Sequence, residues 1–137
     1  MPLAATHSLL LAALGMALEV LFTALADLGQ AGNWRLRGYT YAWMLPIYLL
    51  VYPLLSLLYP RISGWPALAR GLLYTGLIYA VEYTSGWLLR IAVGEAPWEK
   101  EYSKAPWAFQ GLIRLDFAPL WLGVSLLFER VFRVLRG

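Results

Sequence analysis

The sequence has 137 residues, of which 61% are hydrophobic and only 14% are charged. A soluble domain carries about 25% charged residues, so this composition excludes an ordinary soluble domain and indicates contact with lipid. The net charge of +3 gives no indication of nucleic-acid binding. The sequence has no cysteine and a single histidine, His7. These counts exclude disulfides, thiolate catalysis and a histidine metal cage, and we expect neither a metal nor a bound cofactor.

Four apolar stretches are each near the length of about 20 residues that crosses a bilayer. They cover about residues 8–28, 41–59, 68–93 and 117–135, with glycine- and proline-containing segments between them. We predict a single all-α domain, residues 1–137: an integral membrane bundle of four transmembrane helices, with an amphipathic loop between helices 3 and 4. No Lys or Arg precedes the first stretch, so we expect it to be retained as a helix and not cleaved as a signal peptide.

Glu19 lies near the middle of the first stretch, and Thr23 and Asp27 follow at intervals of four on the same helix face. A charged side chain at the bilayer centre costs at least about 2.5 kcal/mol on insertion scales. It is tolerated if it faces the bundle interior, finds a partner or takes up a proton. Two interpretations stay open: a site for a proton, cation or substrate amine, or a neutral glutamate that hydrogen-bonds neighbouring helices.

The second stretch carries a tyrosine stripe on nearly one helix face. Its members are Tyr41, Tyr48, Tyr52 and Tyr59. We interpret the outer two as anchors at the membrane interface, whereas Tyr48 and Tyr52 are deep enough to line a polar site. Pro46 and Pro53 predict a kink in this helix, because proline cannot donate a backbone hydrogen bond.

The third stretch, like the first, contains an acidic residue, Glu82, among apolar residues. Tyr79 and Gly86 share its helix face, so a hydroxyl and a gap for another helix lie beside it. Glu82 and Glu19 fall at similar depths, and both can therefore reach one cavity. The loop of residues 95–110 is either a partial lid over the bundle or a solvated connector.

Arg114 and Asp116 precede the fourth stretch. Asp116 lies three residues before Pro119, which is typical of a helix N-cap. Arg114 is alternatively a counter-ion to Glu19 or Glu82, or an anchor for a substrate phosphate or carboxylate. Near the end of this stretch, the spacing of Glu129 and Arg133 predicts an ion pair within one helix.

The distribution of arginines favours one orientation. With four spans, both termini and the second connection lie on one side of the membrane, which also carries five arginines. They are Arg61, Arg70, Arg130, Arg133 and Arg136. Counting by the positive-inside rule, we expect a multi-pass protein of the cell membrane with both termini cytoplasmic.

Several motifs resemble one family. Residues 37–40 (Arg-Gly-Tyr-Thr) and 45–48 (Leu-Pro-Ile-Tyr) are similar to the arginine-glycine and proline-isoleucine-tyrosine elements of the CmpB-like family of ABC-transporter type IV proteins. Glu19 lies where that family has its first-helix glutamate, and residues 82–89 resemble its third-helix glutamate segment. Residues 111–121 resemble the start of its last helix. The resemblance covers nearly the whole chain and extends to small eukaryotic four-helix transmembrane proteins.

The resemblance implies a transport-related, permease-like membrane subunit. In this hypothesis a buried polar site binds a cation, a proton or a substrate group. Its candidate residues are Glu19, Glu82, Arg114, Asp116, Tyr48 and Tyr52. Two alternatives stay open: a non-catalytic accessory or scaffold subunit of a larger membrane complex, and a membrane-embedded enzyme acting on a lipid or isoprenoid, with two carboxylates as acid and base.

The expected partners follow from the same observations. The sequence has no G-x-x-x-x-G-K-[ST] loop, so we do not expect the chain to bind ATP in that way. We expect the lipid bilayer as its surroundings, no nucleic acid, and a second copy or another membrane subunit as a partner. Gly15, Gly76 and Gly86 favour such close helix contacts.

Overall fold

The computed structural model describes residues 2–32 and 34–137, and most of them are helical. The helices are α1 (Leu3–Ala31), α2 (Met44–Tyr48), α3 (Val51–Ile62), α4 (Ala67–Val93), α5 (Glu99–Tyr102), the 3-10 helix η1 (Leu115–Phe117) and α6 (Ala118–Arg136). A short antiparallel hairpin, β1 (Ala108–Phe109) and β2 (Ile113–Arg114), lies between α5 and η1. The mainly helical prediction is confirmed; the hairpin was not predicted.

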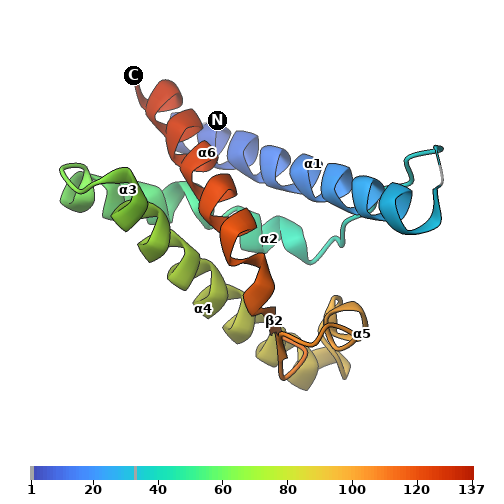
Figure 1. Ribbon diagram of the computed structural model, residues 1–137. Helices are drawn as coiled ribbons and strands as arrows, with labels where there is room; N and C mark the ends of the chain where they lie inside the picture. Colours follow the sequence, from blue (N-terminus) through green and yellow to red (C-terminus); the bar gives the residue numbers. More distant parts are fainter. Residues whose placement is uncertain (1, 33) are drawn as a thin grey trace.

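The long helices gather at one end and separate at the other. Both termini and the turn between α3 and α4 lie at the gathered end (Figure 1). At the other end, α1 and α4 point apart, and α4 leads into the segment that contains α5. α6 packs along α4, whereas α1 packs mainly on α2 and α3. The interior is therefore closed by α6 and α2, which lie between the diverging helices.

The second apolar stretch forms two helices, α2 and α3, instead of one. Pro53 cannot donate a hydrogen bond to the carbonyl of Leu49, four residues earlier. At the break, the Leu50 amide turns to the carbonyl of Ile47 at 3.1 Å, a tighter spacing than in an α-helix. The prolines thus produce a break after Tyr48, a larger effect than the expected kink.

Two helical segments are long and apolar enough to cross a membrane by length and composition. They are α1 and the stretch Met44–Ile62. Their large apolar side chains are widely exposed, as at Leu21 and Leu57, which is unusual for a soluble surface. α4 and α6 have 27 and 19 residues. α4 carries three charged residues spread along its length, whereas those of α6 begin at Glu129. That they also cross the membrane stays a prediction.

Two of the three glycines expected at helix contacts meet neighbours within the chain. A Cβ atom at Gly15 would lie 2.5 Å from the ring of Tyr48, and one at Gly86 would lie 2.8 Å from Leu112. At Gly76, nothing in the described chain lies within 4 Å of an added Cβ. Gly15 therefore provides the space in which Tyr48 lies against α1.

Gly15→Ala and Gly76→Ala form a matched pair for testing this contact. The added methyl at position 15 overlaps the Tyr48 ring, and we expect a loss of about 1–3 kcal/mol in the free energy of unfolding. The same change at position 76 meets no neighbour and removes only backbone freedom, so we expect stability to be unchanged or raised by up to about 1 kcal/mol. Thermal unfolding in detergent measures both; equal losses would contradict the packing.

Candidate functional site

Glu19 meets Tyr48 inside the bundle. The Tyr48 hydroxyl donates a hydrogen bond of 2.9 Å to Oε2 of Glu19. Gly15 lies one turn before Glu19 on the same face of α1, so the glycine that admits the tyrosine ring also places its hydroxyl at the carboxylate. α1 and α2 thus share a polar contact in an otherwise apolar interface.

Glu82 lies on α4 and is 7% exposed. The Tyr102 hydroxyl interacts with its carboxylate, and Glu19 is close enough for direct electrostatic repulsion. Tyr48 interacts electrostatically with both carboxylates. An electrostatic interaction thus connects Glu82 on α4 with Glu19 on α1; that the two carboxylates form one site stays a prediction. Burial and the Glu82 carboxylate raise the pKa of Tyr102, which stays a neutral hydrogen-bond donor.

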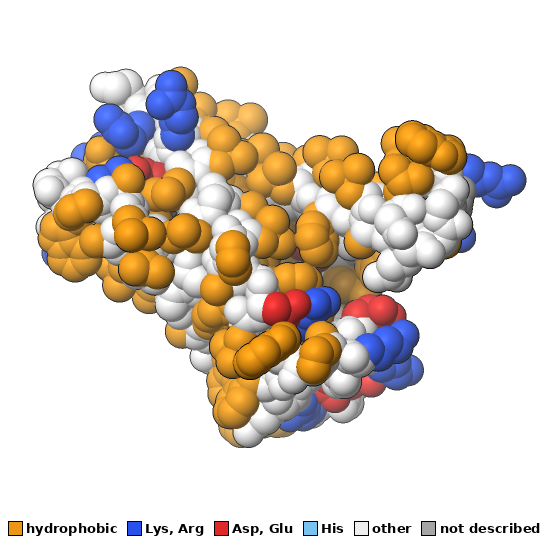
Figure 2. Space-filling model, viewed as in Figure 1, with side chains coloured by type: hydrophobic (Ala, Val, Ile, Leu, Met, Phe, Trp, Pro, Cys, Tyr) orange, Lys and Arg blue, Asp and Glu red, His pale blue; other side chains and the backbone are white. Residues whose placement is uncertain are grey.

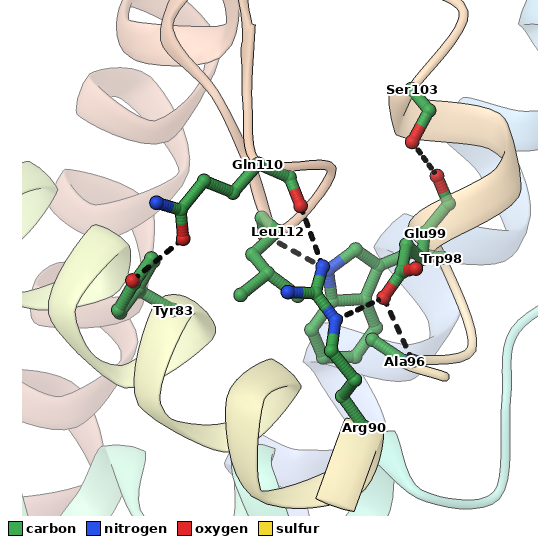
Figure 3. A network of polar contacts seen from close by, with 8 residues as sticks. All are labelled: Tyr83, Arg90, Ala96, Trp98, Glu99, Ser103, Gln110 and Leu112. Atoms are coloured by element: carbon green, nitrogen blue, oxygen red, sulfur yellow. Dashed lines mark hydrogen bonds and ion pairs between the residues drawn. The ribbon is translucent and has the colours of Figure 1, made fainter. Parts of the chain in front are cut away.

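The segment that follows α4, here called the α5 segment (residues 94–112), folds back against this helix. Arg90 on α4 donates one hydrogen bond to Glu99 at 2.8 Å and another to the Gln110 carbonyl at 2.6 Å (Figure 3). The indole of Trp98 is buried and donates to the Leu112 carbonyl at 2.9 Å. The start of this loop is packed, with Ala96 and Trp98 buried, whereas Lys100, Lys104 and Trp107 are exposed; that the loop serves as a partial lid stays a prediction.

The packed α5 segment covers Glu82. Gly86, one turn after Glu82, leaves the space that Trp98 and Leu112 occupy. Tyr102 stacks near Trp98, with ring centroids 6.4 Å apart, and holds its hydroxyl toward the carboxylate. A second contact, from the Tyr83 hydroxyl to Oε1 of Gln110 at 2.8 Å, ties the hairpin to α4 (Figure 3).

Removing the Trp98 side chain should release the α5 segment. Trp98→Ala loses a buried ring and its hydrogen bond, so we expect trypsin to cut after Lys100 and Lys104 about tenfold faster or more. Trp107 is 62% exposed, and Trp107→Ala is the matched control, for which we expect an unchanged rate. Cleavage that is equally fast in the unaltered protein would show that the segment is not held.

Arg114 and Asp116 bind one another at the surface end of this region. The Arg114 guanidinium hydrogen-bonds both carboxylate oxygens of Asp116, at 3.1 and 2.5 Å, and lies 4.0 Å from the centre of the Phe117 ring. This guanidinium lowers the pKa of Asp116. The predicted N-cap role of Asp116 is wrong: Phe117 takes that position, without a side-chain cap. The structure does not bring Arg114 to Glu19 or Glu82, because Asp116 two residues away is its partner.

Tyr52 lies apart from the carboxylates. Its hydroxyl is 3.5 Å from Nδ1 of His7, and its ring packs on Phe132 at 5.4 Å between centroids. The break after Tyr48 separates the two tyrosines, so only Tyr48 of the pair faces Glu19. Tyr52 joins the packing of α1, α3 and α6 instead.

A second buried acidic group, Glu129 on α6, was missed as a tertiary contact. It accepts two hydrogen bonds from Arg70, both 2.9 Å, and one from the Tyr74 hydroxyl at 2.6 Å. The ion-pair partner of Glu129 is Arg70 instead of the predicted Arg133. Arg133 contributes only a weaker electrostatic interaction, and its guanidinium lies 5.8 Å from the centre of the Tyr59 ring. Arg70 and Tyr74 are four residues apart on one face of α4, but this spacing alone does not assign them to Glu129.

Glu129→Gln should destabilise the bundle, because Arg70 is left without its charge partner and is only 14% exposed. We expect a loss of about 2–3 kcal/mol in the free energy of unfolding. Arg133→Gln removes the other candidate partner, and we expect a change within about 0.5 kcal/mol. Chemical unfolding in detergent compares the two variants; a larger effect of the Arg133 change would restore the predicted pair.

Among the described residues, no group of three His, Asp or Glu side chains lies close enough together to hold a metal ion. The acidic groups instead find hydroxyls and arginines. The candidate site therefore consists of Glu19, Glu82, Tyr48 and Tyr102, contributed by α1, α4, α2 and α5. This arrangement can hold a proton or one cationic group between two carboxylates.

A sequence profile described as "Putative ABC-transporter type IV", of the CmpB family, matches residues 8–136. The chain belongs to the CmpB family. The predicted resemblance is thereby confirmed, and the match includes every helix of the bundle. No solved structure was found to match the chain. Family membership and the two apolar helical segments together indicate a transporter-related protein located in a membrane.

Proposed function

We propose that this chain crosses the cell membrane four times and serves as a transport-related subunit, with a buried site that binds a proton or a cation. The four crossings would be α1, Met44–Ile62, α4 and α6. Support comes from the outer face of α4, where Leu68, Leu72 and Ile91 are each about 60% exposed. In a bilayer such a face is solvated by lipid, whereas Glu82 on the same helix points inward.

The proposal is supported by the electrostatic interaction between Glu19 and Glu82, and by Tyr48, which hydrogen-bonds Glu19 and is affected by both carboxylates. Two carboxylates that repel one another in an apolar interior cannot both stay charged without a counter-charge. Either one takes up a proton, or a cation lies between them. Both states change the charge of the site by one unit, which is the property that a coupled transporter requires.

Access to this site is proposed from the side of the α5 segment. Figure 2 shows a hollow between the C-terminal end of α1 and the α5 segment, with acidic and basic side chains beside it. The Arg114–Asp116 pair is partly exposed, 25% and 32%, and can guide a charged group toward Tyr102. Basic side chains also gather at the end that holds the C-terminus (Figure 2), which agrees with cytoplasmic termini.

Flux through purified protein in liposomes tests this function. With an imposed pH or potassium gradient and an internal pH-sensitive dye, we expect Glu19→Gln and Glu82→Gln each to reduce proton or cation flux at least about tenfold, because each removes one of the two charges. Glu101→Gln is the matched control, since Glu101 lies on the exposed side of α5, and its flux should equal that of the unaltered protein.

Two results would contradict the proposal. Flux that persists in the Glu19→Gln, Glu82→Gln double variant would remove the carboxylates from the pathway. Absence of flux in the unaltered protein, together with a partner that co-purifies in fixed ratio, would favour an accessory subunit. The open face at Gly76 favours this second candidate, because close approach of another helix there is unobstructed.

A further inference from the structure

A cavity of about 110 Å³ lies beside Glu82, between α2, α3, α4 and α6. Its walls are mostly aliphatic. They include Leu54, Leu55, Leu58, Leu77, Ile78 and Val81. α3 packs mainly on α1 and α6, and α4 mainly on α6, so the cavity faces outward between α3 and α4. Leu57 and Leu72, on the outer faces of these helices, are more than half exposed, so the surroundings of this opening are apolar.

Two buried side-chain atoms, each belonging to a residue that lines the cavity, have no hydrogen-bond partner within the described chain. They are Oε1 of Glu82 and Nε1 of Trp121. Buried polar groups are nearly always hydrogen-bonded, so each such atom calls for a partner from outside the protein. The indole N–H can only donate, and the carboxylate oxygen accepts when Glu82 is ionised. One atom therefore requires an acceptor and the other, when Glu82 is ionised, requires a donor, and both atoms belong to residues of the same cavity.

A hydroxyl group satisfies both requirements, because it donates one hydrogen bond and accepts others. It serves equally well if Glu82 carries a proton, since it then accepts from the carboxyl group. An ammonium group donates only and would leave Trp121 unpaired. An alkyl chain alone would leave both atoms unpaired.

The size of the cavity limits what enters it. A cavity of about 150 Å³ holds one benzene molecule, so 110 Å³ admits a small head group and the first few carbons of a chain. The remainder must pass out between α3 and α4, where a bilayer presents acyl chains. The ligand is therefore slender, with its hydroxyl at one end.

We propose that this groove binds a long-chain lipid alcohol, aliphatic or isoprenoid, whose hydroxyl lies between Glu82 and Trp121 and whose chain extends into the bilayer between α3 and α4. The assignment rests on the membrane-spanning arrangement of the proposed function and names a ligand class for the Glu82 side of the same site. Tyr74 and Ser125 also line the wall, near the head group and the emerging chain.

The test uses the full chain in lipid nanodiscs and a hexadecanol that carries a photoreactive diazirine in its chain. Competition by unlabelled hexadecanol, its methyl ether and hexadecane separates the head-group requirements. We expect hexadecanol to compete, the methyl ether to be about tenfold weaker because it cannot donate, and hexadecane to be ineffective. The cross-linked peptides should come from α3 or α4.

A conservative variant checks the donor. Trp121→Phe keeps an aromatic ring but removes the indole N–H, and we expect hexadecanol to compete about three- to tenfold less well. Trp107→Phe, at an exposed tryptophan, is the matched control and should not change competition. The comparison among the three competitors in the unaltered protein needs no variant, so a folding defect cannot mask the result.

Three results would overturn the assignment: equal competition by hexadecanol and hexadecane, stronger competition by hexadecylamine than by hexadecanol, or cross-links confined to α1. The readout is independent of flux. If flux is absent while the alcohol is still discriminated, the transport proposal alone fails. If flux depends on Glu82 but the alcohol and alkane bind alike, the lipid-alcohol assignment alone fails.

Discussion

In the described part of this bundle, acidic groups in apolar surroundings take their hydrogen bonds from side chains of other segments, because leaving them unpaired is costly. That constraint explains the least regular parts of the fold. Glu19 takes its hydrogen bond from Tyr48, which requires a glycine opposite the tyrosine ring and a short helix that ends at that residue. The proline-induced break after Tyr48 lets α2 follow α1 while α3 turns away, and both helices then border the cavity.

The same constraint acts on α4 and explains why the α5 segment is packed. The hydroxyl that interacts with Glu82 belongs to Tyr102, on a segment 20 residues further along the chain. Gly86 and Trp98 fit together so that this segment is held by buried area as well as by hydrogen bonds. A loop that would otherwise be solvated thus becomes part of the site, and its local stability governs access to Glu82.

Sequence patterns predicted the helices because long apolar runs and proline breaks are local properties. They also placed Glu19 and Glu82 at similar depth, since rise per residue is fixed in a helix. The sequence did not predict the ion-pair partners of the charged residues correctly. Arg114 and Glu129 each had a plausible partner in the sequence, yet Arg114 paired with the adjacent Asp116 and Glu129 with Arg70 on another helix. Which faces meet depends on the rotation of each helix about its axis, and local spacing does not contain that information.

Glu129 and Glu82 are both buried, but they differ in how completely the protein satisfies their oxygens and their charge. Glu129 has both oxygens hydrogen-bonded and its charge balanced by Arg70, so a ligand would gain nothing by displacing these partners. Glu82 stands next to another carboxylate, and one of its oxygens is unpaired within the described residues. Such an unpaired buried oxygen calls for a partner from outside the chain, such as water or a ligand. The balance of partners, more than burial itself, therefore supports the proposed site at Glu82 and leaves Glu129 as a structural contact between α4 and α6.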